Sequence, residues 1–468
     1  MDTSELDDDT LYSGTGFAGM ADPVPGEPVT ELGYARRLTG VYGDRLRYVP
    51  AWRCWLVWDG RRWARDSTGQ AARWMKAIAR RLTSDAMALE SDRERAEAMK
   101  TARRGESSAG VAGALTLAST EPGIVLTPDE LDADPYLLNC RNGVLDLRTG
   151  QLGPHDPGLL ITRLAGADYH PAADGPEFTA FLQRVQPDEQ MRQFLARLLG
   201  HALDGTVTSH VLPIFHGEGQ NGKSTLTGAV MAALGDYADA ADPGLLTART
   251  FDAHPTGVAD LCGLRLAVLH ETDAGRHLAE GTVKRLTGGD RLKARRMRED
   301  FWSFTPTHTF VMLTNHQPII TGTDEGIWRR IRLIPWDVVI PPGDRDEQLP
   351  AKLAGELPAI LAWLAAGYRD WASGGLGEPD QVARATAAYR GRSDALGRFI
   401  ADACVLSPQF TAGSTDLYTA WSKWCANEGE DPGSQTALAA ALQNKGYDKT
   451  KDHSGRMRWK GIGLASYP

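Results

Sequence analysis

Hydrophobic residues along this chain recur with two spacings, and each spacing predicts a different kind of element. Helical patterns predict a helical stretch over about 70–103, two helices over 176–204 and further helices over 345–372. Shorter apolar runs predict a strand at 142–147 and a hairpin at 55–63, with Asp-Gly at its turn.

The order of these patterns divides the chain into segments. Residues 209–340 alternate strand-like runs with helical patterns, which predicts an α/β domain with a mainly parallel sheet. An α+β region over 33–175 precedes it, and the last segment, 396–468, has the pattern of helices followed by a hairpin. Residues 376–395 are Gly-rich and then charged, which predicts a linker, and the acidic residues 1–32 predict a disordered tail.

The net charge of −9 at first disfavours a nucleic-acid partner, but the charge is unevenly distributed. Residues 1–35 carry eight acidic residues and no Lys or Arg, so the rest of the chain is close to −1. Such a body can carry local basic patches that bind phosphate. The tail itself is interpreted first as a solvated terminus, with competition for basic surfaces as the alternative.

Two further features narrow the class of protein. No apolar run approaches the ~20 residues that span a membrane, and the acidic start does not have the pattern of a secretory signal. The five cysteines are scattered and form no Cys-x-x-Cys pair, so we expect neither a disulfide framework nor a zinc site. We therefore expect a protein of a reducing cytoplasm with no membrane partner.

The strongest chemical signal is the pattern G-x-x-x-x-G-K-S at 217–224, between a strand-like run and a helical pattern that ends at Gly235. Its glycines let backbone N–H groups face phosphates, and the helix N-terminus adds positive charge. We predict that Lys223 bridges the β- and γ-phosphates of ATP and that Ser224 holds Mg²⁺. The predicted nucleotide-binding set is Gly217, Glu218, Gly219, Gln220, Asn221, Gly222, Lys223, Ser224 and Thr225.

Two later strand-like runs end in polar residues. The run 265–270 leads into Glu271 and Asp273, and a carboxylate there can bind Mg²⁺ or polarise the attacking water. Glu271 is the first candidate and Asp273 the second; the alternative is an acidic surface turn. The run 309–313 leads to Asn315, which we interpret as a sensor of the γ-phosphate rather than an ordinary strand cap.

Arginines alternate with apolar residues at 328–332. One of the three, Arg329, Arg330 or Arg332, could be an arginine finger that reaches the ATP of a neighbouring subunit and stabilises transition-state charge. A salt-bridged strand with exposed arginines is an equally good interpretation of the spacing alone.

Together these residues resemble a superfamily 3 helicase of the phage and plasmid primase–helicase family, which is related to poxvirus-type primase–helicases. The resemblance covers nearly the whole chain after the tail. The segments that carry it are 55–63, 142–147, 221–225, 271–273, 284–290, 294–296, 314–316 and 328–331.

The resemblance implies an AAA+-like core over 176–375, a ring that is usually a hexamer, ATP between subunits and 3′-to-5′ movement on a single strand. It makes Arg330 the first finger candidate and Arg329 the second, and it makes Glu271 a functional acid. The family often has two neighbouring acids at this strand end, whereas here Thr272 separates Glu271 from Asp273.

Two basic segments are the candidates for DNA contact. The resemblance puts a DNA-contacting hairpin at 291–300, although a basic run is usually a solvated face. The segment 396–468 has the pattern of a winged helix with a wing at 453–455, for which docking to a protein is the alternative function. The candidate residues are Lys293, Arg295, Arg296 and Arg298 in the first segment, and Lys449, Lys451, Arg456 and Arg458 in the second.

The predicted function is an ATP-dependent DNA helicase that acts on single-stranded and forked DNA during replication of a phage, plasmid or integrated element. No primase centre is evident, so any priming or loading falls to a separate protein. The alternative is an ATP-gated origin-binding or assembly ATPase that does not unwind DNA. A small-molecule kinase is disfavoured, because it would leave both basic segments unexplained.

Overall fold

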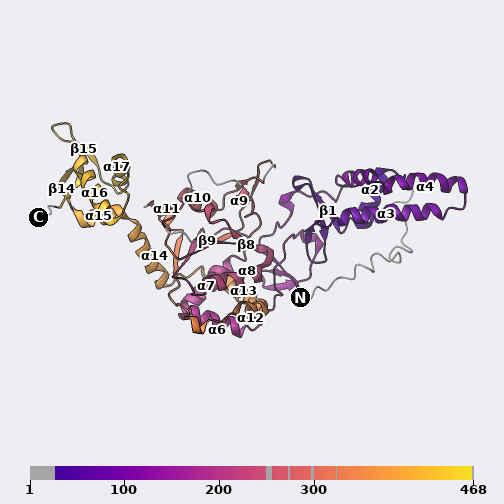
Figure 1. Cartoon of the computed structure of the whole chain (residues 1–468), viewed down its shortest axis with the longest axis horizontal. Helices are drawn as coiled ribbons and strands as arrows, with labels where there is room; N and C mark the ends of the chain where they lie inside the picture. The colour runs from indigo at the N-terminus through magenta and orange to yellow at the C-terminus, as the bar shows by residue number, and fades with distance from the viewer. Residues whose placement is uncertain (1–26, 249–255, 272–274, 297–299, 323, 466–468) are drawn as a thin grey trace.

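The computed structural model describes residues 27–248, 256–271, 275–296, 300–322 and 324–465. These residues form an elongated molecule (Figure 1). An N-terminal helical arm lies at one end, an α/β domain in the middle and a small C-terminal unit at the other end. Residues 1–26 of the predicted tail lie outside the described part.

The central domain is built on a five-stranded, fully parallel sheet, as the sequence predicted. Its strands read as continuous apolar runs because both faces are covered, and every residue of β12 is buried. From one edge of the sheet to the other, the strands are the fifth, first, fourth, third and second of this sheet in the order of the chain. They are β13 (Ile331–Pro335), β7 (Leu212–His216), β12 (Thr309–Thr314), β9 (Leu266–Glu271) and β8 (Ala238–Ala241).

Alternate residues of these strands enter two separate cores. Phe215 and Leu313 pack with helices α7 and α13, whereas Ile214 and Met312 pack with α10 and α14. The two helices predicted over 176–204 are present, and so are those predicted over 345–372. The helices of this domain are α6 (Pro176–Val185), α7 (Glu189–His201), α8 (Lys223–Leu234), α9 (Thr256–Ala259), α10 (Glu280–Leu286), α11 (Glu325–Trp328), α12 (Leu349–Gly355) and α13 (Leu357–Gly374).

The segment predicted as a linker is mostly helix α14 (Asp380–Ser393), which lies against β13. Val382 is buried in one core of the central domain and Tyr389 in the other. The prediction was wrong because the charged residues of this segment hide two apolar anchors seven positions apart. The segment is therefore part of the central domain's packing.

The N-terminal region combines helices with two small antiparallel sheets. The hairpin at Asp59-Gly60 is present, and the helical stretch predicted over 70–103 consists of two helices, because the chain breaks and Ser91 caps the second one. Helix α2 begins at Glu31, inside the predicted tail. The elements are α2 (Glu31–Tyr42), β1 (Leu46–Val49), β2 (Cys54–Trp58), β3 (Trp63–Arg65), α3 (Gln70–Met87), α4 (Asp92–Glu106), α5 (Ser108–Ala118), β4 (Leu137–Cys140), β5 (Gly143–Asp146) and β6 (Gln151–Gly153).

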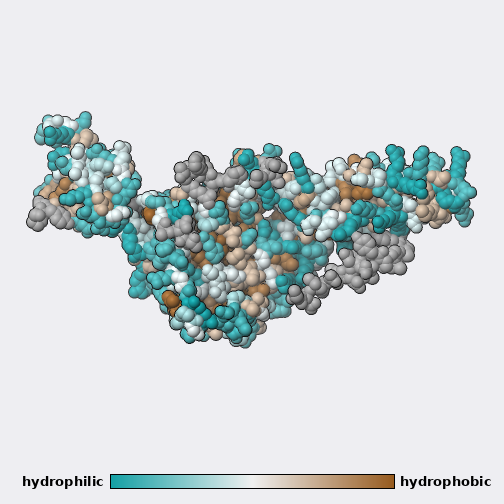
Figure 2. Space-filling view, viewed as in Figure 1, coloured by the Kyte–Doolittle hydropathy of each residue, from teal (hydrophilic) through white to brown (hydrophobic). Residues whose placement is uncertain are grey.

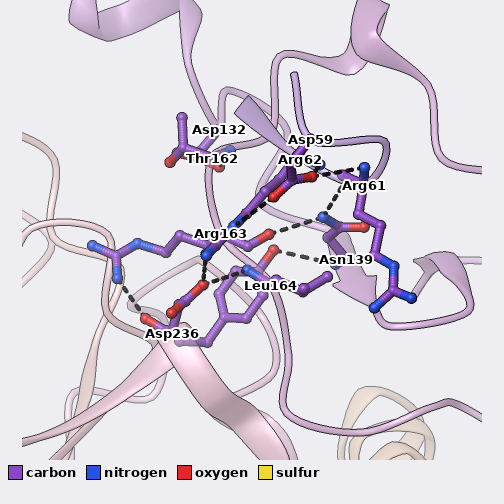
Figure 3. A network of polar contacts seen from close by, with 10 residues as sticks. Asp59, Arg61, Arg62, Asp132, Asn139, Thr162, Arg163, Leu164 and Asp236 are labelled. Atoms are coloured by element: carbon purple, nitrogen blue, oxygen red, sulfur yellow. Dashed lines mark hydrogen bonds and ion pairs between the residues drawn. The ribbon is translucent and has the colours of Figure 1, made fainter. Parts of the chain in front are cut away.

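A polar joint connects this region to the central domain (Figure 3). The buried side-chain amide of Asn139 donates to the carbonyl oxygens of Arg61 and Arg163, both at 2.9 Å. Arg62 pairs with Asp236, which follows α8, and Arg163 donates to the carbonyl of the same residue. Because buried or half-buried polar groups meet specific partners here, the joint holds the β2–β3 turn against the end of α8.

The C-terminal unit has its own core around Phe399, Trp421 and Trp459. Its two predicted helices and the turn at 453–455 are present. A long strand, β14, was not predicted, because Pro408 and a register shift between Leu406 and Thr411 interrupt its pattern. The elements are α15 (Ala395–Ala403), β14 (Cys404–Gly413), α16 (Ser414–Glu428), α17 (Gln435–Asn444), β15 (Lys449–Lys451) and β16 (Met457–Leu464).

Among the described residues, no single helix is long and apolar enough to cross a membrane. The segments Pro342–Gly355 and Leu357–Gly374 reach that composition only when they are taken together across a bend of 75°.

Candidate nucleotide site and DNA-facing surfaces

The predicted phosphate loop connects β7 to α8 in a strained, tightly packed conformation. Gln220 and Gly222 have left-handed backbones, with φ of 65° and 85°. A Cβ on Gly217 would lie 2.2 Å from the carbonyl oxygen of Trp336, and one on Gly222 would lie 2.6 Å from Val185. Glycine is therefore needed at both ends of the loop for space, and at Gly222 for conformation as well.

Lys223 spans this loop. Its Nζ donates to the carbonyl of Gly217 at 2.6 Å and to Oδ1 of Asn315 at 3.3 Å. The side chain is only 6% exposed, and burial lowers the pKa of its ammonium group. The structure thus brings together two residues that the sequence places 92 positions apart.

The ends of three strands meet at this loop. Thr314 of β12 is paired with Glu271 of β9 on one side and with His216 of β7 on the other. Asn315 follows directly, and the backbone of Glu271 therefore ends at the same edge of the sheet. Asp273 lies outside the described residues. Ser224 is exposed in the first turn of α8.

Two loop residues support the loop through their side chains. Asn221 is 3% exposed and donates to the carbonyls of Glu218, at 2.5 Å, and Trp336, at 3.1 Å. Gln220 accepts from the guanidinium of Arg345, and its carbonyl accepts from the backbone of Ile340 at 2.9 Å. Both side chains therefore bind the loop to the segment that follows β13. Nothing in the local sequence pattern pointed to that segment.

The two finger candidates lie at the opposite end of the sheet from the loop. They precede Ile331, which pairs with the first residue of β7, so the length of one strand, ~16 Å, separates them from their own loop. Arg330 is 8% exposed and donates to Thr287 Oγ1 at 3.1 Å and to the carbonyl of Gly326 at 2.6 Å. Arg329 is exposed. Burial thus ranks Arg329 above Arg330 as a residue that can reach another subunit, the reverse of the order expected from the sequence.

Arg332, two positions later, pairs with Glu378 at 2.8 Å. This ion pair agrees with the salt-bridged-strand interpretation for that residue.

One further cation near the phosphate loop was missed. Arg392, in the segment predicted as a linker, donates to Gln317 at 3.0 Å, two residues after Asn315. Burial lowers the pKa of His216 at the end of β7, and the charges of Lys223 and Arg392 lower it further. Arg392 therefore lies at the same edge of the sheet as the loop. No local signal could have identified it, because it arrives from a distant helix.

The predicted hairpin is present as β10 (Leu292–Ala294) and β11 (Trp302–Phe304). Lys293 is exposed between two buried neighbours, Arg295 and Arg296 are half-buried, and Arg298 lies outside the described residues. Phe301, which we had not singled out, is 50% exposed. Lys293 Nζ lies 4.9 Å and the Arg295 guanidinium 4.8 Å from the centre of its ring. The hairpin thus presents an aromatic surface flanked by two cations.

In the C-terminal unit, Lys449, Lys451 and Arg456 are exposed around the β15–β16 turn. Arg458 instead donates twice to Thr411, at 3.0 Å. Its side chain therefore stabilises the pairing of β14 with β16.

Comparison with known proteins relates the chain to viral proteins. The family "D5 N terminal like" matches residues 35–187, and a family of unknown function (DUF5906) matches residues 215–330. A protein of Acanthamoeba polyphaga mimivirus named "Putative helicase" is 29% identical over 319 residues, 63% of this chain and 33% of that protein. Another of that name from Frog virus 3 is 28% identical over 267 residues, 52% and 27% of the two chains.

A protein named "Putative primase" from African swine fever virus is 29% identical over 211 residues, 43% of this chain and 22% of that protein. The match thus spans a third or less of the length of these relatives. Among solved structures, the apo C-terminal region of NrS-1 aligns with a TM-score of 0.49 at 11% identity, over 93% of this chain and 100% of that chain.

Proposed function

We propose that this chain, a relative of the viral and phage primase–helicases as its residues had predicted, is the ATP-hydrolysing motor of a DNA helicase. The observation that supports this most is the position of Lys223. Its ammonium group lies between the phosphate loop and Asn315, at the carboxyl edge of a parallel sheet. Ligands of open α/β sheets bind at this edge.

The roles of the residues follow from this arrangement. Backbone N–H groups of residues 217–225 bind the phosphates of ATP, and Lys223 neutralises charge on the β- and γ-phosphates. Glu271, with Asp273 second, polarises the attacking water, which Asn315 orients without adding charge. Mg²⁺, held by Ser224 and by Glu271, would supply further neutralisation of the phosphate oxygens.

The strand order fits an AAA+-like core, and such cores act in rings. Because the finger candidates lie one strand length from their own loop, either could act only on the ATP of a neighbouring subunit. We assign that role to Arg329, since Arg330 is engaged within its own chain. The hexameric ring and 3′-to-5′ movement rest on the family resemblance.

DNA contacts are assigned to the β10–β11 hairpin and to the C-terminal unit. Exposed cations beside an aromatic ring suit a single strand, because the cations bind phosphates and bases stack on the ring. The C-terminal unit has the element order of a winged helix, and Lys449, Lys451 and Arg456 at its turn suit forked or duplex DNA. The alternative function, an assembly ATPase, would need that unit but not the hairpin.

The test is ATP hydrolysis by the purified chain with and without single-stranded DNA. We expect DNA to stimulate hydrolysis, and Lys223→Ala to abolish it. Lys352→Ala removes one exposed cation, paired with Asp346, and is the matched control that should leave hydrolysis unchanged. Hydrolysis that ignores DNA, in the wild type and in hairpin variants alike, would favour the assembly ATPase.

A further inference from the structure

We propose that Arg53 and Arg65, at one end of the β1–β3 sheet, extend the DNA-binding surface of the β10–β11 hairpin and hold phosphates of the same strand. This inference rests on the proposed function and assigns a role to a region for which the sequence had suggested none.

Basic residues outnumber acidic residues in the N-terminal arm. Residues 34–106 contain 17 basic and 9 acidic residues, a net charge of +8 in a chain of net charge −9. Within them, residues 36–66 contain eight basic and three acidic residues. Figure 2 shows hydrophilic residues over much of the visible face of the arm. An excess of this kind attracts phosphate whatever the charge of the whole chain.

An ion pair connects the β10–β11 hairpin to the segment that packs under the β1–β3 sheet. The guanidinium of Arg291, at the start of the hairpin, lies 3.9 Å from the carboxylate of Asp129. The residues that flank Asp129, Leu126 and Leu131, pack under the β1–β3 sheet in one small core with Leu56. The hairpin is therefore held beside this sheet.

One arginine of the sheet and one arginine that follows β10 lie close to Cys54. Burial raises the pKa of the Cys54 thiol in β2, and the charges of Arg65 and of Arg296, which follows β10, partly oppose this shift. Arg53 is next to Cys54 in the chain, and Arg65 is paired with Leu56 across the sheet. Arg65 and Arg296 therefore both lie near Cys54, and Arg53 precedes Cys54 in the chain.

The side chains of Arg53 and Arg65 are both exposed. Arg53 has a left-handed backbone, φ 49°, a conformation that non-glycine residues rarely adopt. Neither Arg53 nor Arg65 forms an ion pair with any residue that the structure describes, whereas Arg62 pairs with Asp59 and Asp236.

The guanidinium of Arg65 lies 5.2 Å from the ring centre of Trp52. This pair repeats the arrangement of cation and aromatic ring around Phe301 in the hairpin. Both places thus offer a phosphate contact next to a ring on which a base can stack.

The test is the binding of the full-length chain to a fluorescent oligo-dT over a series of salt concentrations. The variant Arg53→Gly/Arg65→Ala removes two charges, and its glycine relieves the left-handed strain, so folding should be kept; thermal unfolding checks this. We expect the variant to bind on the order of tenfold more weakly. Its affinity should also depend less on salt, because binding with fewer phosphate contacts releases fewer counterions.

The control Arg93→Ala/Lys100→Ala removes two exposed charges from α4, away from the hairpin, and should bind as the wild type does. Equal loss in both variants would overturn the proposal, since general charge would then explain binding. Unchanged binding by Arg53→Gly/Arg65→Ala, with binding lost in Lys293→Ala/Arg295→Ala, would also overturn it and leave the proposed function standing. Failure of the wild type to bind at all would overturn both.

Discussion

The phosphate loop and the proposed DNA-binding surface differ in how their polar side chains are held. In the loop, Lys223 and Asn221 are buried and each makes two hydrogen bonds at defined distances. On the proposed DNA-binding surface, Arg53 and Lys293 are exposed, and the Lys293 ammonium group lies 4.9 Å from the ring centre of Phe301. A triphosphate must be held in one geometry for reaction, whereas a moving strand must be bound by electrostatic contacts that form and break readily.

The largest effect is expected at Arg329 and Arg330, which are neighbours but differ in burial. We expect Arg329→Ala to lower turnover on the order of 1,000-fold, the typical effect of an arginine finger, without changing stability. Arg330→Ala should instead destabilise the fold by about 2–3 kcal/mol, because it removes two charge-assisted hydrogen bonds, to the buried hydroxyl of Thr287 and to the half-buried carbonyl of Gly326.

Steady-state hydrolysis and chemical denaturation of both variants check this assignment. If Arg330→Ala is fully stable yet inactive, the finger is Arg330 and its buried position in the single chain is not the one it has in the assembly.

Two buried histidines predict an effect of comparable size on stability at acid pH. Burial lowers the pKa of both His201 and His308 to about 4, against an ordinary value near 6.5. Below about pH 6.5 the unfolded chain takes up protons that the folded chain refuses. Stability should therefore be complete above that pH and fall towards pH 4, by about 3 kcal/mol for each histidine.

Urea denaturation at several pH values measures this loss. His308→Phe removes one titrating group and keeps a ring against Phe310, so it should flatten part of the dependence. An unchanged slope in that variant would assign the acid sensitivity to other groups.

On the DNA-facing surface, the comparison is sharpened at Phe301. Phe301→Ala should weaken binding of single-stranded DNA by about 1–3 kcal/mol, the usual contribution of a stacked base, and leave hydrolysis without DNA unchanged. Phe301→Trp should bind as well as the wild type. Fluorescence anisotropy with oligo-dT measures both. Equal loss with alanine and tryptophan would mean that Phe301 only supports the hairpin.

The smallest expected effect concerns the acidic segment before Glu27. Glu27 pairs with Arg36 on α2, and six further acids precede Glu27 in the sequence. Deleting residues 2–26 should strengthen DNA binding by a few-fold at low salt and by less at high salt, because salt screens the competition. Unchanged affinity at low salt would leave the segment a solvated terminus.

Much of this protein was determined by local sequence. The strand, loop and helix around Lys223 and the parallel sheet were predicted, because each depends on the spacing of apolar residues or on glycines within one short segment. The β10–β11 hairpin was implied by the family resemblance. The family resemblance followed from the same short segments. Local rules suffice where neighbouring residues in the chain supply both the conformation and the chemistry.

Only the tertiary structure decided which of two adjacent arginines is buried, that residues 380–393 pack as a helix, and that Arg392 lies near Asn315. It also decided that the β1–β3 sheet lies beside the hairpin. Burial of Arg330 depends on Thr287, 43 positions away, and the position of Arg53 depends on a core shared with Leu126. Contacts of this kind leave no periodic trace in the sequence, since neither partner constrains the residue types around the other.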